Sequence, residues 1–263
     1  MKFIREYKEF SELDLLSGKS IENLDKEIIM KLLYKFRNKE IGGKLEKIID
    51  RFKNDEQWGK YSTSDDWFED KEYKTFMQYF KRKLSKEKFA EIKSRKSRMS
   101  IPCECIVESI GDFRDTSSIL RLKKETDSVV EDLKEIGIKN IEGLSFINMK
   151  LLKVYYHRIH SPLDCQVKNI IEVSQENNFF GNNNLWIVEL QTRDYGNVFL
   201  VLVGELSIKD FTFKIKVGDN LNMYDEVGNF NWASQVLLIY DNTKFGKIRI
   251  KKSGKYFIGD PVY

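Results

Sequence analysis

Histidine and cysteine are scarce in this chain of 263 residues, which contains two histidines and three cysteines. Three cysteines cannot build a disulfide framework, so we expect a reducing, cytoplasmic environment. No apolar run approaches the roughly 20 residues that a membrane-spanning helix needs. Residues 1–6 also lack the apolar segment of a secretory signal. We therefore expect a protein that is soluble or lies peripherally on the inner face of a membrane without crossing it.

Several common site motifs are absent as well. The chain has neither a His-Glu-x-x-His zinc pattern nor a glycine-rich phosphate loop of either standard type. Cys103 and Cys105 lack the two-residue spacer that is typical of redox and zinc motifs. No zinc knuckle or other nucleic-acid module is recognisable. We expect neither a metal nor a nucleic acid among the ligands of this protein.

Positive charge is concentrated in two stretches, although the net charge is only +4. Residues 81–98 contain nine basic residues against Glu87 and Glu91, and residues 244–255 contain six basic residues and no acid. Such stretches can meet anionic lipid or nucleic acid. Most charged runs, however, form solvated surface. Contact with anionic lipid and a plain solvated surface both stay open at this point, whereas no recognisable module favours nucleic acid.

Residues 1–80 are predicted to form a helical N-terminal region. Apolar side chains recur at helical spacing within residues 24–36, and a second amphipathic segment covers residues 45–52. A third helix is predicted from about residue 71 to residue 84.

Strand patterns dominate after about residue 100, where short β-like runs lie between turns. The clearest runs cover residues 185–190, 198–203, 211–217, 235–240 and 247–251. Apolar residues make up 41% of the chain, which is enough for a packed core. We predict an α+β fold in which a helical N-terminal layer, residues 1–80, lies on a β-rich catalytic core, residues 81–263.

The two histidines lie three residues apart, in the string Tyr-His-Arg-Ile-His-Ser-Pro. Imidazole is the side chain best suited to moving protons near neutral pH, so His157 and His160 are candidate catalytic residues. Two other interpretations stay open from the residues alone. The pair can ligate a metal, for which further ligands are needed, or it can be a buried, hydrogen-bonded structural pair.

Five segments, in the same order, resemble the phosphatidylserine decarboxylase family. Residues 156–162 resemble its Tyr-His-Arg-x-His-x-Pro signature, and residues 226–236 its Glu-Met-Gly-x-Phe-x-x-Gly-Ser-Thr-Val segment around a self-cleavage site. Residues 73–84 are similar to its Ser-Phe-Asn-Glu-Phe-Phe-x-Arg-x-Leu segment. Residues 102–105 and 201–204 fall where the family has Pro-Ala-Asp-Gly and Val-Gly-Ala elements. The shared order and spacing support the resemblance more than any single segment does.

The resemblance implies a proenzyme that cleaves itself between Ala233 and Ser234. The Ser234 hydroxyl attacks the preceding carbonyl, and the serine is converted into an N-terminal pyruvoyl group. This cofactor reacts with the substrate amine and serves as the electron sink while CO2 leaves. By motif position, His160 is the base for self-cleavage and Glu104 the carboxylate that orients it, while His157 assists decarboxylation or protonation.

Phosphatidylserine is the leading substrate that the resemblance implies, with phosphatidylethanolamine and CO2 as products. Some residues depart from the family pattern: Ala233 replaces a glycine, Glu104 an aspartate, and Cys105 and Cys165 the glycines of two Asp-Gly turns. These departures leave two alternatives, a related amino-acid substrate or a catalytically degenerate member that acts as a binding or membrane-surface protein. We also expect peripheral membrane contact through residues 24–36, and a homodimer stays open.

Overall fold

The computed structural model describes residues 38–40, 49–50, 65–69, 72–113, 133–134, 138, 141–152, 155–173, 184–204, 211–231, 234–246 and 248–263. The chain divides into two compact units, Met1–Lys83 and Leu84–Tyr263.

Two short helices occur in the described part of the first unit, η3 (Asp65–Trp67) and α5 (Phe76–Phe80). Thr75 begins α5 with a capping box, because the Gln78 amide donates to the Thr75 hydroxyl at 3.1 Å and the Gln78 side chain accepts from the Thr75 amide. This reciprocal cap fixes the start of the helix at Phe76. The helix buries one face, which carries aromatic residues.

The helix predicted for residues 71–84 is therefore wrong in its extent, since the capping box delays its start and the backbone leaves helical geometry at Lys81. Residues 49 and 50, within the second predicted segment, are helical. Most of residues 1–80, including the apolar stripe of residues 24–36, lies outside the described residues, so the helical N-terminal layer stays a prediction. No helix within the described ranges is long and apolar enough to cross a membrane.

The second unit begins with α6 (Lys86–Ser94) and is otherwise built mainly of strands. The strands are β1 (Cys105–Asp112), β2 (Ser145–Leu151), β3 (Arg158–His160), β4 (Cys165–Val173), β5 (Asn184–Gln191), β6 (Asn197–Gly204), β7 (Phe211–Phe213), β8 (Asn220–Leu221), β9 (Glu226–Phe230), β10 (Ser234–Tyr240) and β11 (Lys255–Tyr256). Two 3-10 turns, η4 (Ile141–Gly143) and η6 (Asn242–Lys244), complete the elements.

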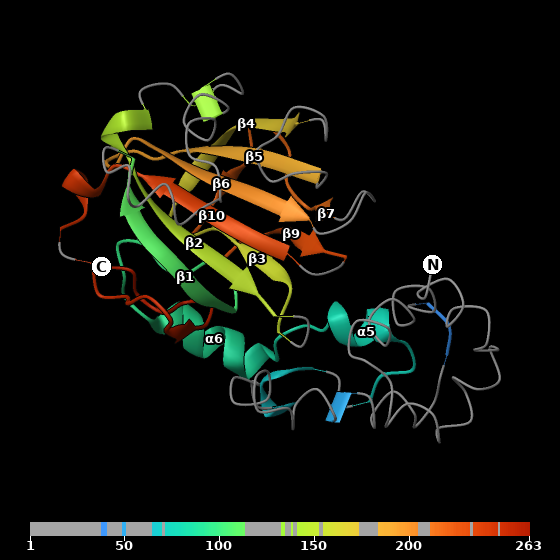
Figure 1. Ribbon diagram of the computed structural model, residues 1–263. Helices are drawn as coiled ribbons and strands as arrows, with labels where there is room; N and C mark the ends of the chain where they lie inside the picture. The colour runs from blue at the N-terminus through green and yellow to red at the C-terminus, as the bar shows by residue number, and fades with distance from the viewer. Residues whose placement is uncertain are drawn as a thin grey trace, which may run out of the picture. The chain divides into compact units, whose positions relative to one another are not determined.

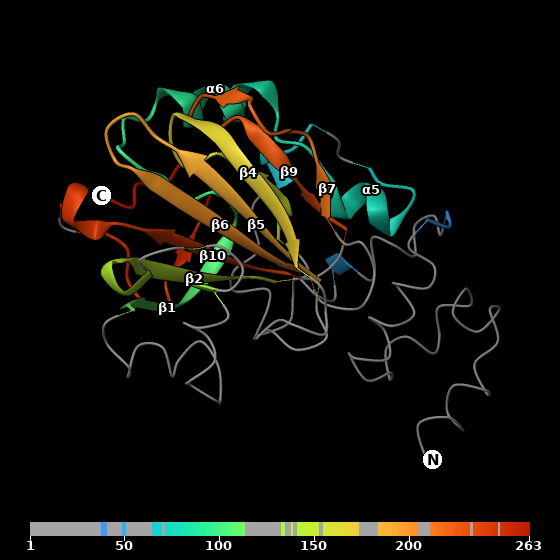
Figure 2. The same ribbon diagram turned by 90° about the horizontal axis from the view of Figure 1, so that it is seen from above.

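The strands form two antiparallel sheets, which confirms the predicted β-rich core (Figures 1 and 2). The large sheet has eight strands in the order β11-β1-β2-β10-β6-β5-β4-β8, and the small sheet has the order β3-β9-β7. Strand β10 lies between β2 and β6, so the segment that begins at Ser234 occupies the middle of the large sheet. A central strand is buried on both faces, which fits the continuous apolar run of β10.

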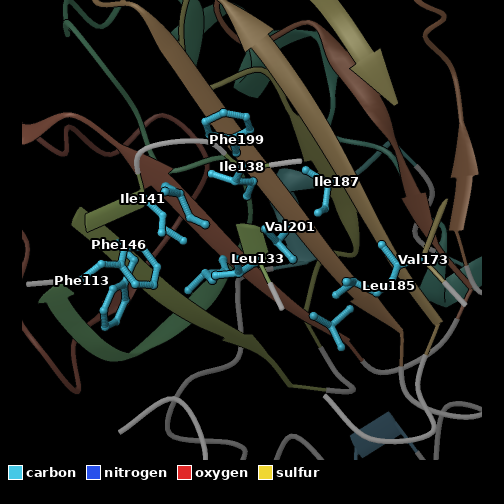
Figure 3. Close-up of a cluster of buried hydrophobic side chains, with 13 residues drawn as sticks. Phe113, Leu133, Ile138, Ile141, Phe146, Val173, Leu185, Ile187, Phe199 and Val201 are labelled. Atoms are coloured by element: carbon cyan, nitrogen blue, oxygen red, sulfur yellow. The ribbon is translucent and has the colours of Figure 1, made fainter. Parts of the chain in front are cut away.

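A hydrophobic cluster covers one face of the large sheet (Figure 3). Leu237 and Ile239 of β10, Val201 of β6 and Ile187 of β5 contribute side chains to it. These residues alternate with others that point to the opposite face, because successive side chains of a strand point to opposite sides. Ser234 is an even-numbered residue of β10 and therefore points away from this cluster.

The runs predicted at residues 185–190, 198–203 and 235–240 are confirmed as β5, β6 and β10. The run at 211–217 is a strand only up to Phe213. The run at 247–251 is wrong: residues 248–251 are not in a strand, and residue 247 is outside the described part. Two backbone amides of residues 248–251 form single hydrogen bonds that are not part of a strand ladder. The Arg249 amide donates to the Val262 carbonyl, and the Lys251 amide donates to the Tyr256 hydroxyl.

Candidate active site

Ser234 is the first residue of β10, and its backbone is paired with Leu151 of β2 and Gly204 of β6. The side chain is buried, and its hydroxyl has no hydrogen-bond partner among the described residues. Most buried hydroxyls in folded proteins have a partner, so this one calls for a chemical explanation. A hydroxyl without a competing hydrogen bond is available to react.

The small sheet covers the face of the large sheet to which Ser234 points. Trp186 lies on this face, because it is aligned with Leu202 of β6 and, through it, with Val236 of β10. The Trp186 ring contacts two aromatic rings of β7, with centroid distances of 6.1 Å to Phe211 and 6.4 Å to Phe213. Ser234 therefore points toward the small sheet, whose strand β3 contains His160, and His157 directly precedes this strand.

The backbone also holds the histidine segment close to Ser234 in the fold. The Phe230 amide donates to the His157 carbonyl at 3.0 Å. Four residues of extended chain, as from Phe230 to Ser234, span at most about 14 Å. On the other side, Leu151 opposes Ser234 only a few residues before His157. Two segments distant in sequence thus converge on one region.

His160 lies in β3 with both ring nitrogens occupied. Its Nδ1 is 2.7 Å from the Tyr224 carbonyl oxygen, and its Nε2 is 2.9 Å from the Tyr156 hydroxyl. A carbonyl only accepts, so Nδ1 carries the proton, and in the neutral ring Nε2 accepts from Tyr156. Burial lowers the pKa of His160 from 6.5 to about 4, although the bond to the Tyr224 carbonyl acts in the opposite direction. His160 is therefore a neutral base at physiological pH.

The His157 ring, like that of His160, is oriented by a hydrogen bond from Nδ1 to a backbone carbonyl. Its Nδ1 is 2.7 Å from the Tyr155 carbonyl oxygen, so this nitrogen donates and Nε2 is the nitrogen left to exchange a proton. The side chain is completely buried. A backbone carbonyl thus accepts a hydrogen bond from Nδ1 of each histidine and fixes the orientation of each ring.

Glu104 reaches the histidine segment from about fifty residues upstream, but its carboxylate does not bond to the His160 ring. One carboxylate oxygen accepts from the Tyr156 amide at 2.7 Å, and the other lies 3.1 Å from the Lys255 ammonium. Tyr156 therefore connects the two residues: its backbone binds Glu104 and its hydroxyl binds His160. The direct hydroxyl-histidine-carboxylate chain expected from the sequence is replaced here by an arrangement that passes through Tyr156.

Tyr224 is a residue of this site that the sequence did not reveal. Its φ of 76° lies in the left-handed region, which non-glycine residues rarely adopt. Its amide donates to the Ser161 carbonyl and its hydroxyl to the Arg95 carbonyl, and these bonds hold the backbone in place. The strained conformation directs the Tyr224 carbonyl at His160.

A group of three charged residues lies beside the histidines. Arg158 of β3 and Lys214 both form ion pairs with Glu226 of β9. Burial alone raises the pKa of Glu226, but the hydrogen bond to Lys214 and the charge of Arg158 lower it on balance. Glu226 is therefore ionised at neutral pH and links β3 to β9, next to the site.

The three cysteines form no disulfide among the residues that the structure describes. Cys103 and Cys105 are buried and Cys165 is half-buried, and all three are free thiols. Burial raises the pKa of Cys105 well above its usual range and that of Cys165 to about 11, so neither forms a thiolate near neutral pH. The part of the chain that the structure describes contains no cluster of three potential metal ligands. Ala233, the residue before Ser234, lies outside the described residues.

Comparison with known proteins places these residues in a family. The phosphatidylserine decarboxylase family profile matches residues 76–263. Phosphatidylserine decarboxylase proenzyme 2 of Komagataella phaffii is 26% identical over 191 residues, 66% of this chain and 19% of that protein. Phosphatidylserine decarboxylase proenzyme of Geobacillus sp. is 28% identical over 185 residues, 65% of this chain and 70% of that protein.

Among solved structures, the CbpA structure from L. salivarius REN overlaps 42% of this chain and 68% of its own, with 14% sequence identity and a TM-score of 0.26, a likeness too weak to support an argument. The family profile, by contrast, covers the histidine pair, Glu104 and Ser234 together. This chain belongs to the phosphatidylserine decarboxylase family.

Proposed function

We propose that this protein is a pyruvoyl-dependent decarboxylase that converts phosphatidylserine to phosphatidylethanolamine and CO2. One observation supports the proposal most directly: the buried Ser234 hydroxyl, without a hydrogen-bond partner among the described residues, lies on the face of the large sheet that the small sheet covers, and β3 of the small sheet contains His160. The family of the chain and the names of its relatives supply the substrate.

The first reaction is self-cleavage between Ala233 and Ser234. The Ser234 oxygen attacks the Ala233 carbonyl carbon, its proton passes to a base, and the amide becomes an ester. Removal of the Ser234 α-proton then breaks the bond from Cβ to the ester oxygen and releases the Ala233 carboxylate. Hydrolysis of the resulting enamine releases ammonia and leaves a pyruvoyl group at position 234. The unengaged hydroxyl fits this role, since no other bond must be broken before attack.

His160 is the base in this proposal because burial keeps its ring neutral, with Nε2 able to accept a proton. The Tyr156 hydroxyl now occupies Nε2, so it must turn away or relay the proton before His160 can act. Catalytic hydrogen bonds often form only in the reacting state. Glu104 is a positioning residue, since it holds the Tyr156 backbone amide.

Once formed, the pyruvoyl carbonyl supplies the electron sink for loss of CO2. His157 then protonates the substrate carbon that loses CO2. Its Nδ1 donates to the Tyr155 carbonyl, so Nε2 is the ring nitrogen that can carry a proton to the substrate. Burial of the ring excludes water, which favours delivery of the proton to carbon at this position.

A membrane-bound substrate requires contact with a lipid surface. Residues 24–36, outside the described part, combine an apolar stripe with Lys26, Lys31, Lys35 and Arg37 at or beside it. We propose that this segment forms a helix which lies on anionic membrane. We expect the protein to bind vesicles of anionic lipid, and this binding should weaken as the salt concentration rises. Equal binding to anionic and neutral vesicles would contradict this proposed membrane contact.

Enzyme activity is tested with three purified proteins: wild type, Ser234→Ala and Ser109→Ala. Ser109 is a matched control because its buried hydroxyl also has no partner among the described residues, but it lies in β1. Phosphatidylserine in detergent micelles is the substrate, and CO2 and phosphatidylethanolamine are measured. Wild type and Ser109→Ala should turn over, and Ser234→Ala should not.

The same assay separates the alternatives. If the protein decarboxylates free serine or another amino acid but not the phospholipid, the proposed substrate is wrong and the proposed pyruvoyl chemistry stands. Absence of turnover with every substrate, in a protein that stays one chain, supports the degenerate member that Ala233 and Glu104 leave open. Activity that survives in Ser234→Ala contradicts the proposal.

A further inference from the structure

The two basic stretches of the sequence meet at one open cavity of about 920 Å3 in the second unit. Lys96 and Arg98 come from the segment after α6, and Arg249 and Lys251 come from the C-terminal segment. Backbone bonds hold the two segments together: the Arg249 amide donates to the Val262 carbonyl at 2.8 Å and the Val262 amide to the Met99 carbonyl at 2.9 Å. Figure 1 shows the C-terminal segment, in red, beside α6.

The four cations of this cavity, Lys96, Arg98, Arg249 and Lys251, are exposed and form none of the ion pairs found among the described residues. No acidic residue is among the described residues that line the cavity. A nearby basic residue outside the cavity lining does form an ion pair, since Arg95 pairs with Asp260. Four positive side chains with no acidic side chain among the described lining residues repel each other and attract an anion.

The floor of the cavity is formed by aromatic residues. Phe245 and Tyr263 are buried and stacked, with ring centroids 5.1 Å apart, and Tyr195 stacks on Phe245 at 4.4 Å. Arg98 donates to the Phe245 carbonyl at 3.2 Å, which fixes its guanidinium at the cavity while other donors stay available. Gly246 follows with a φ of 95° and nothing within 4 Å of a Cβ placed there, so the cavity is open at this point.

This cavity lies away from the proposed active site. Strand β10 runs from Ser234 to Tyr240, which contacts Phe245 of the cavity floor at a centroid distance of 5.8 Å. Six residue steps of a strand cover about 20 Å. An anion bound here therefore does not touch Ser234 or the histidines.

We propose that this cavity binds a phosphorylated ligand, with the phosphate on the four cations and a less polar part of the ligand against Phe245 and Tyr263. Guanidinium and ammonium groups bind phosphate through short, charge-assisted hydrogen bonds. The aromatic floor favours a phosphate ester over inorganic phosphate. The ester comes either from a soluble metabolite or from the headgroup of an anionic lipid. The proposal is independent of the decarboxylase activity.

Calorimetric titration with pyrophosphate and with phenyl phosphate tests the soluble form. The variant is Arg249→Gln/Lys251→Gln, and the matched control is Lys252→Gln, an exposed neighbour that does not line the cavity. The double variant should bind about a hundredfold more weakly, at about tenfold per charged hydrogen bond removed. The control should bind as the wild type does, and phenyl phosphate should bind more tightly than inorganic phosphate does in a parallel titration.

Flotation with vesicles distinguishes the source of the phosphate. Binding to phosphatidic acid vesicles that the double variant loses and that pyrophosphate displaces identifies a lipid headgroup. Pyrophosphate binding without such vesicle binding identifies a soluble ester. The proposal is overturned if wild type, control and double variant bind both probes alike, if no probe binds at millimolar concentration, or if only DNA binds. Intact self-cleavage or an unchanged thermal unfolding midpoint shows that the double variant is folded.

Discussion

The buried, neutral His160 should make the stability of the fold depend on pH. Its pKa is about 4 in the folded protein, against an ordinary value of 6.5 when exposed. The folded pKa is the lower one, so the stabilisation is complete above pH 6.5 and is lost as pH falls towards 4. A difference of about 2.5 pH units, at about 1.4 kcal/mol each, amounts to about 3 kcal/mol.

Urea unfolding of the Ser234→Ala chain, which the proposed chemistry predicts to stay one chain, measures this loss between pH 7 and pH 4. Ser234→Ala/His160→Gln is the matched control, because it lacks the imidazole but keeps the carboxylates, including Glu226. The free energy of unfolding should fall more steeply in the protein that has His160, and the two curves should separate by up to about 3 kcal/mol. Parallel curves for the two proteins refute the assignment of a buried neutral His160.

Three further variants test the neighbourhood of the site. Tyr156→Phe removes the hydroxyl bound to His160, which should cost about 1–3 kcal/mol in urea unfolding. Self-cleavage followed on gels should become faster if this hydroxyl has to turn away, and slower cleavage shows instead that the hydroxyl relays the proton. Gly228→Ala places a methyl carbon against the Thr212 carbonyl and should destabilise the fold by about 1–3 kcal/mol in the same assay; no change contradicts the packing. His157→Ala should still cleave but lose turnover by about 10²–10⁴; an equal, mild effect of His160→Ala would return both histidines to a structural role.

The sequence predicted the centre of the large sheet because its strands are long apolar runs. Residues 235–240 could hardly be anything but a buried strand, and they are the core of β10. The alternating run at 247–251 looked equally strand-like, but no neighbouring strand pairs with its described residues. Helix α6 was missed, since its few apolar residues gave no clear helical stripe; its N-cap Ser85 was the available signal.

The candidate site was predicted as a set of residues but not as a geometry. Motif position named Ser234, His160 and Glu104 and predicted a direct contact between Glu104 and His160, whereas the structure connects them through Tyr156. The Tyr224 carbonyl reaches His160 only because the chain adopts a left-handed conformation at a residue whose side chain gives no sign of it. The role of Tyr156 likewise depends on tertiary contacts that place its amide and hydroxyl against two different partners.

The intact mass of the purified protein tests most directly whether Ser234 is the precursor of the cofactor. The proposed chemistry predicts two polypeptides divided between residues 233 and 234. The smaller one should be lighter than the peptide of residues 234–263 by the mass of one ammonia molecule, since the serine has become a pyruvoyl group. Ser234→Ala should give one full-length chain. A wild-type protein that stays a single chain of 263 residues, or a Ser234→Ala protein that still divides at this bond, contradicts the assignment.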